Sequence, residues 1–167
     1  QKNCSVDLTW AFIKPNRYKN IEGIKKVRYG SILFYYELAT AKIIITNYRM
    51  TEDFYKRNEQ VYIQTWHSSL RLKMIERDAE SNLPLNYIKM AKKDSAQIDY
   101  LLSGCRMGKK IFENAFWYSG SIIETGTPQC DILKNTDLSI ETKVYEYFNL
   151  PRDTNIILYA PTFRKDH

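Results

Sequence analysis

The residues best suited to chemistry stand where an apolar run meets two serines. His67 follows the run Val61–Trp66, VYIQTW, and precedes Ser68 and Ser69. An imidazole in water has a pKa near ~6.5, so it exchanges protons near neutral pH and suits a general base. Either serine would cap a following helix and leave the first N–H groups of that helix facing a phosphate. The alternative is a half-buried histidine held by a structural hydrogen bond.

Several other classes of site lack their motifs in this sequence. There is no Walker loop, no GxGxxG and no GxSxG nucleophile elbow. The other histidine is His167, and Cys4, Cys105 and Cys130 have no CxxC spacing. We therefore expect no metal site and no cofactor, and we interpret the cysteines as free thiols in a reducing compartment.

Composition favours a folded domain with an anionic partner. Hydrophobic residues make up 44% of the 167 residues, enough for a packed core. Lys and Arg number 25 against 19 Asp and Glu, so the net charge is +6. This excess suits a nucleotide, an anionic polymer or a lipid surface, although a basic domain without such a partner is an equal alternative. No apolar run approaches the ~20 residues of a membrane span.

The elements that would position His67 follow an alternating pattern. Short, continuously apolar runs indicate strands covered on both faces, as in a parallel sheet. These predicted strands cover residues 8–13, 42–47, 61–66, 98–103, 121–125 and 155–160. A ligand site in such a sheet lies beyond the carboxyl ends of the strands, where His67 stands.

Helical patterns separate the predicted strands. One helix follows Ser31 as its N-cap, a second has an apolar face from Met107 to Phe116, and a third follows Ser139 and ends before Pro151. The lysine-rich segment 86–94 reads as a solvated helix end. The alternation predicts an α/β, Rossmann-like parallel-sheet domain.

Four stretches, in order, resemble the CDP-glycerol glycerophosphotransferase family, whose members prime and polymerise teichoic acids. They are YELATAKIIITN, KRNEQVYIQTWHSSLRLKMIE, ETGTPQCDIL and IILYAPTFR. The family pattern runs roughly Q-x-W-H-G-T-P-L-K-K, then G-x-P-R-x-D, then L-Y-A-P-T-[FW]-R. The matching residues are Gln64, Trp66, His67, Lys73, Gly126, Pro128, Asp131 and the run Leu158–Arg164.

The sequence departs from that pattern at four positions. Ser68, Ser69 and Leu70 stand where the family has Gly, Thr and Pro, and Gln129 stands where it has Arg. The lost arginine weakens a phosphate-binding role for that loop. The substitutions indicate a divergent subfamily, with another polyol phosphate or acceptor.

The resemblance implies a GT-B architecture of two Rossmann-like lobes. Residues 1–150 would form the amino-terminal, acceptor-side lobe, and residues 151–167 a linker and the first strand of a carboxyl-terminal, donor-binding lobe. The implied activity moves glycerol phosphate, or a related polyol phosphate, from a CDP-activated donor to a lipid-linked teichoic-acid-type or capsular polymer. We expect residues 1–167 alone to be inactive.

The same resemblance suggests roles for individual residues. His67 would be the general base, and the substrate-binding residues would be Ser68, Ser69, Lys73 and Arg164. A structural turn would be formed by Gly126, Pro128 and Asp131. Trp66 is expected in the core.

The implied setting is the cytoplasmic face of a bacterial cell membrane, with peripheral attachment to its anionic surface and no nucleic-acid partner. Lys92, Lys93, Lys109 and Lys110 are the candidate membrane contacts. Two alternatives remain open: a noncatalytic basic module that binds an anionic polymer or membrane, and a GT-B sugar-nucleotide glycosyltransferase.

Overall fold

A computed structural model describes residues 6–68, 73–134 and 138–160. The chain divides into two compact units, Gln1–Pro128 and Gln129–His167, each described here by itself. The sequence places a functional boundary at residue 150, and that division stays a prediction.

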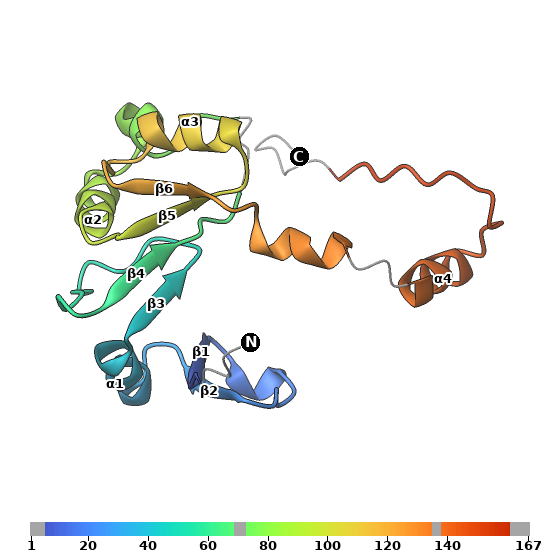
Figure 1. Ribbon diagram of the computed structural model, residues 1–167, viewed down its shortest axis with the longest axis horizontal. Coiled ribbons are helices and arrows are strands. Elements are labelled where there is room, and N and C mark those ends of the chain that lie inside the picture. Colours follow the sequence, from blue (N-terminus) through green and yellow to red (C-terminus); the bar gives the residue numbers. More distant parts are fainter. Residues whose placement is uncertain (1–5, 69–72, 135–137, 161–167) are drawn as a thin grey trace. The chain divides into compact units, whose positions relative to one another are not determined.

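A four-stranded parallel sheet organises the first unit (Figure 1). Its strands lie in sequence order, and the predicted parallel α/β arrangement is confirmed. They are β3 (Ile43–Thr46), β4 (Val61–Gln64), β5 (Tyr100–Ser103) and β6 (Ser121–Glu124). Because all four run the same way, their carboxyl ends share one edge of the sheet.

A separate pair of parallel strands precedes this sheet. Strand β1 (Leu8–Phe12) pairs with β2 (Ile24–Arg28), and the 3₁₀ helix η1 (Pro15–Arg17) lies between them in the chain. The sequence analysis missed β2, because Lys25 and Lys26 interrupt the apolar pattern. Helix α1 is tied to this pair, since Glu37 of α1 accepts hydrogen bonds from Thr9 at 2.9 Å and Lys25 at 2.5 Å.

The predicted helices form, with shifted ends. They are α1 (Ile32–Thr40), α2 (Leu85–Ser95), α3 (Arg106–Ala115) and α4 (Leu138–Tyr147), with the 3₁₀ helices η2 (Glu76–Asn82) and η3 (Pro128–Lys134). Ser31 caps α1 as predicted, because its hydroxyl oxygen accepts the Phe34 N–H at 3.2 Å.

Two expectations about helices need correction. The segment expected to be a solvated helix end is a full helix, α2, whose one face is buried through Ile88, Ala91, Asp94 and Ser95. In α3, Met107 is exposed, and the buried face is formed by Gly108, Phe112 and Ala115. Hydrophobic periodicity alone does not show where that face is centred, since tertiary neighbours decide it.

The core lies where β4 and β5 meet the carboxyl half of α3. Its buried members are Ile44, Met50, Phe54, Tyr62, Trp66, Ile98, Leu101, Phe112, Ala115 and Phe116. The expectation that Trp66 belongs to the core is confirmed.

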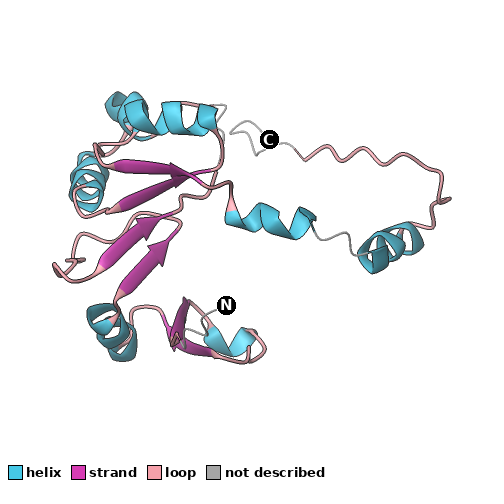
Figure 2. Ribbon diagram, in the orientation of Figure 1, coloured by secondary structure: helices cyan, strands magenta, loops and turns pink. Residues whose placement is uncertain are grey.

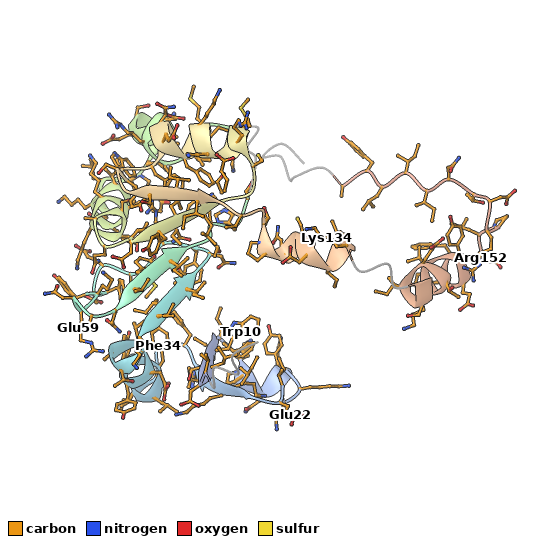
Figure 3. The ribbon with its side chains drawn as sticks, viewed as in Figure 1. Trp10, Glu22, Phe34, Glu59, Lys134 and Arg152 are labelled. Atoms are coloured by element: carbon orange, nitrogen blue, oxygen red, sulfur yellow. The ribbon has the colours of Figure 1, made fainter. Side chains whose placement is uncertain are left out.

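The continuously apolar runs favoured strands covered on both faces, and β3 departs from that expectation. Ile43 and Ile45 are 56% and 64% exposed. Both line an apolar pocket of about 570 Å³, together with residues of β1, β2 and α1 that include Trp10 and Phe34, labelled in Figure 3. Ile43 and Ile45 share one face of β3, because alternate residues of a strand point the same way, whereas Ile44 on the other face is buried.

In the second unit, the strand predicted at 155–160 is absent. Residues 151–160 run as loop after α4 (Figure 2). A strand needs a neighbouring strand for its backbone hydrogen bonds, and no described segment pairs with 155–160. The apolar side chains expected to form one face of α4, such as Tyr147 and Phe148, are likewise exposed.

Within the described residues, none of the helices has the combined length and apolar character that crossing a membrane requires.

Candidate active site at the ends of strands β3 and β4

The site forms where two neighbouring parallel strands end. Strand β3 is followed by Asn47 and Arg49, and β4 by Trp66 and His67. Backbone pairing continues one step past β4, because the Thr65 N–H donates to the Thr46 carbonyl at 2.8 Å. The two strand ends therefore stay side by side up to the residue before Trp66.

His67 is fixed by a hydrogen bond to the neighbouring chain segment. Its Nδ1 lies 3.1 Å from the carbonyl oxygen of Asn47, and its side chain is exposed. A carbonyl oxygen only accepts hydrogen bonds, so Nδ1 is the protonated nitrogen. In the neutral ring the lone pair is then on Nε2, and this is the tautomer that a base acting through Nε2 requires.

Trp66 holds the ring from the other side. The Trp66 and His67 ring centroids are 4.3 Å apart, and Trp66 meets Phe116 edge-on at 4.9 Å. The φ of Trp66 is 54°, in the left-handed region. Such a conformation costs a bulky residue about 1–3 kcal/mol and persists only where surrounding contacts enforce it.

Gln64 lies beneath this turn and is fully buried. Its Oε1 accepts the Trp66 N–H at 2.9 Å. Its Nε2 is within hydrogen-bond distance of the Tyr48 carbonyl at 3.0 Å, the Thr46 hydroxyl at 3.1 Å and the Tyr62 hydroxyl at 3.2 Å. The side chains of Tyr62 and Gln64 share a face of β4 because alternate residues of a strand point the same way.

A buried ion-pair cluster lies behind the site. Arg49 donates from Nε and Nη2 to Oε2 of Glu76 at 3.1 and 2.7 Å, and from Nη1 to Asp94 at 3.0 Å and Ser95 at 2.8 Å. The guanidinium also packs over the Phe116 ring, 4.6 Å from its centroid. The side chains of Arg49, Glu76 and Asp94 are at most 4% exposed. The cluster ties the loop after β3 to η2 and α2.

The cluster sets the charge states around it. Burial raises the pKa of Asp94, and the hydrogen bond and charge of Arg49 oppose that rise only in part. Burial and the nearby Asp94 carboxylate raise the pKa of Tyr62, so its hydroxyl keeps its proton and donates to Asp94 at 2.9 Å. Tyr87 likewise donates to Glu76, and burial together with that hydrogen bond raises its pKa.

The other residues predicted for the site are placed as follows. Ser68 follows His67 and is half-buried, and Lys73 is exposed. The first described helix after them is η2, whose N-cap is Ile75, so Ser68 does not cap it. Ser69 and Arg164 lie outside the described residues.

The predicted turn follows β6, which is separated from β4 by β5. Gly126 has a φ of 82°, which favours glycine, and Pro128 begins η3. Asp131 is an exposed residue of η3 and belongs to the second unit. Its role at the turn stays a prediction.

Sequence reasoning missed the partners of His67. Asn47 contributes a backbone atom, which no side-chain motif reveals. Arg49, Glu76 and Asp94 are far apart in the chain, and no local pattern in the sequence links them. One signal was available: Asn47 ends a predicted strand and Arg49 lies two residues beyond it, at the sheet edge where the predicted strand 61–66 was also expected to end.

The described residues contain no group of three or more His, Cys, Asp or Glu arranged to hold a metal ion. The chemistry that these side chains offer is proton transfer at His67 Nε2.

Comparison with known proteins gives relatives across the whole chain. The family model for CDP-glycerol:poly(glycerophosphate) glycerophosphotransferase matches residues 1–167. A teichoic acid poly(glycerol phosphate) polymerase of Staphylococcus epidermidis is 31% identical over 165 residues, 94% of this chain and 23% of its own length. A teichoic acid glycerol-phosphate transferase of Staphylococcus aureus is 36% identical over 145 residues, 81% of this chain and 37% of its own.

Solved structures of the same family also match this chain. The wall teichoic acid polymerase TagF matches with a TM-score of 0.82 at 31% identity, over 95% of this chain and 40% of that one. A histidine-to-asparagine variant of TagF soaked with CDPG matches with a TM-score of 0.81 at 30% identity, over the same shares. This chain thus has the fold of part of a GT-B enzyme, and it spans about two-fifths or less of the relatives named here. The chain belongs to the CDP-glycerol:poly(glycerophosphate) glycerophosphotransferase family.

Proposed function

We propose that the full-length protein transfers glycerol phosphate, or a related polyol phosphate, from a CDP-activated donor to a hydroxyl of a growing polymer. Family membership supports the reaction class. The observation that supports a catalytic role for this part of the chain is the contact between His67 Nδ1 and the Asn47 carbonyl, because it leaves Nε2 as the basic nitrogen of an exposed ring.

In the proposed step, His67 Nε2 takes the proton of the acceptor hydroxyl. The hydroxyl oxygen attacks the donor's β-phosphorus, forming a new P–O bond. The bond between that phosphorus and the bridging oxygen breaks, and CMP leaves with the electron pair. A positioned general base typically contributes ~10²–10⁴ to such a rate.

We further propose that residues 1–150 form the acceptor-side lobe, while the donor contacts lie mainly in a carboxyl-terminal lobe. The parallel sheet, with its polar carboxyl edge, supports the first part, since ligands of such sheets bind at that edge. Under this assignment, Ser68, Ser69, Lys73 and Arg164 are the candidates for substrate contacts.

The acceptor is proposed to be lipid-linked, with the protein attached peripherally to the cytoplasmic face of the membrane. The net charge of +6 supports attraction to an anionic surface. Of the candidate lysines, Lys92 pairs with Glu80, Lys93 packs on Tyr55 and Lys109 pairs with Glu124, so their charges are partly engaged within the protein.

The test is turnover by His67 variants of the full-length protein with radiolabelled CDP-glycerol and a lipid-linked acceptor. His67→Gln keeps a polar group of similar reach but removes the basicity. We expect kcat to fall by about 10²-fold or more, in line with the loss of a general base. The KM for CDP-glycerol should stay nearly unchanged, because the donor binds mainly outside this lobe.

A matched control is Glu59→Gln. Glu59, labelled in Figure 3, is exposed just before the amino end of β4, the strand whose carboxyl end carries His67. The kcat of the Glu59→Gln variant should equal that of the wild-type protein. Near-wild-type kcat in folded His67→Gln would reduce His67 to a structural role, and a large rise in the donor KM would contradict the lobe assignment. Turnover of UDP-sugars in place of CDP-glycerol would favour the glycosyltransferase alternative.

A further inference from the structure

We propose that Gln64 is a positioning residue for His67, an inference that rests on the proposed function of that histidine. One buried amide holds both halves of the contact that orients the imidazole: the backbone that carries the ring and the backbone that carries its carbonyl partner.

The first half is the turn at Trp66. The Gln64 Oε1 accepts the Trp66 N–H at 2.9 Å. The residue so held has a φ of 54°, an uncommon conformation for a large side chain. This turn places the His67 ring against the Trp66 ring, with centroids 4.3 Å apart.

The second half is the segment after β3. The Gln64 Nε2 donates to the Tyr48 carbonyl at 3.0 Å and lies 3.1 Å from the Thr46 hydroxyl. These two residues flank Asn47, whose carbonyl accepts from His67 Nδ1 at 3.1 Å. Gln64 therefore fixes the position of the acceptor from both sides.

An amide satisfies both requirements. It has an acceptor oxygen and two N–H donors, whereas a carboxylate only accepts and an alkyl side chain does neither. Without Gln64, the Nδ1 contact loosens and the ring is no longer held in the tautomer with Nε2 as the base. Gln64 does not touch the substrate in this proposal; it acts through His67.

Strand β4 offers a matched control at its other end. Gln60 is also buried, at 2% exposure. Its Nε2 donates to the Leu38 and Ala41 carbonyls at 2.9 and 2.7 Å, and its Oε1 accepts the Arg57 N–H at 2.9 Å. Gln60 and Gln64 thus make similar hydrogen bonds, but only Gln64 bonds to Trp66, Thr46 and Tyr48, the neighbours in the chain of His67 and Asn47.

The experiment compares Gln64→Met with Gln60→Met in the full-length protein. Methionine keeps the length of the side chain and removes its hydrogen bonds. Both variants should lose stability to a similar extent, measured as the urea midpoint of unfolding. Only Gln64→Met should lose kcat, by about 10-fold or more, by analogy with the loss seen when a hydrogen-bonding group that orients a metal-binding histidine is removed. The KM for CDP-glycerol should stay unchanged in both.

The double variant Gln64→Met/His67→Gln should turn over no more slowly than His67→Gln alone, because Gln64 acts through the histidine. If Gln64→Met does not fold, Gln64→Asn and Gln60→Asn replace the pair, and the same comparison of kcat applies. Equal kcat in the two single variants, or an additive loss in the double variant, would overturn the positioning role while leaving the proposed function intact. Full activity of His67→Gln would instead overturn the proposed function itself.

Discussion

Two residues in left-handed backbone conformations bracket the segment that begins with His67. Trp66 and Glu76 have φ values of 54° and 52°, and neither is a glycine. Each is held by hydrogen bonds: Trp66 by the buried Gln64 amide, and Glu76 by the buried Arg49 and the half-buried Tyr87. Such strain, about 1–3 kcal/mol per residue, tends to concentrate at functional sites. Hydrogen bonds thus hold a strained backbone at both ends of the segment that carries the proposed base.

Arg49 is the cation that pairs with both buried carboxylates of the cluster. Its replacement by Met leaves the Glu76 and Asp94 carboxylates buried without a cation. Removing one partner of a buried ion pair typically destabilises a protein by about 3–5 kcal/mol. We expect Arg49→Met to lower the free energy of unfolding by about that amount, measured by urea denaturation.

The control for this prediction is Lys92→Met. Lys92 pairs with Glu80 at 2.8 Å, but the two side chains are 49% and 39% exposed. An exposed pair contributes only about 0–1 kcal/mol. If Arg49→Met costs no more than Lys92→Met, the cluster does not stabilise this part of the fold.

The elements were predictable where the signal is local. Ser31 and the apolar run after it specify α1, and the β-branched run before Asn47 specifies β3. Strand β2 was missed because its lysines hide it, and the strand at 155–160 was wrongly expected because an apolar run does not itself supply a partner strand. His67 was proposed as a site residue from its place after a predicted strand, and that role stays a prediction. Its orientation was not predicted, because Gln64, Asn47 and Arg49 come together only when β3 and β4 pair.

The amino-terminal edge of the sheet makes a prediction about pH. Asp99, just before β5, accepts the Tyr62 N–H at 2.7 Å and hydrogen bonds from Lys56 at 2.9 and 2.8 Å. Burial alone would raise the pKa of Asp99, but the hydrogen bonds from Lys56 and Tyr62 outweigh it, so the pKa is lowered. A lowered carboxylate pKa contributes stability above the unfolded value of about 3.9, and this contribution is lost as the pH falls through the folded value.

We therefore expect Asp99→Asn to be less stable than wild type at pH 7, with the difference shrinking below about pH 4. The measurement is the urea midpoint of both proteins between pH 7 and pH 3. The quantity to follow is the difference in stability between the two proteins at each pH. Asp94 has a raised pKa, so its contribution to stability changes with pH in the opposite direction, but it is present in both proteins and cancels in the difference. A gap that stays constant over this range would show that the Asp99 charge does not contribute.

For the molecule as a whole, the net charge follows directly from the sequence, but the fold decides which charges remain available at the surface. The net charge of +6 is fixed by composition, but part of the basic excess is used internally. Arg49 is buried, Lys56 binds Asp99 and Lys109 lies 3.7 Å from Glu124. Attraction to a membrane therefore depends on which cations stay at the surface, and this depends on tertiary contacts that composition does not specify.

Peripheral attachment is tested by co-sedimentation of the full-length protein with liposomes. Each Lys or Arg near an anionic leaflet contributes about 1 kcal/mol. We expect binding to vesicles containing phosphatidylserine at low salt and loss of binding near 1 M salt, where the screening length falls to about 3 Å. Lys110, an exposed residue of α3, is a candidate contact, so Lys110→Gln should weaken binding by a few-fold. Lys56→Gln should weaken it less, because the charge of Lys56 is paired with Asp99.

Vesicles of phosphatidylcholine alone are the control. Binding that resists salt, or that is equal on the two kinds of vesicle, would contradict electrostatic attachment.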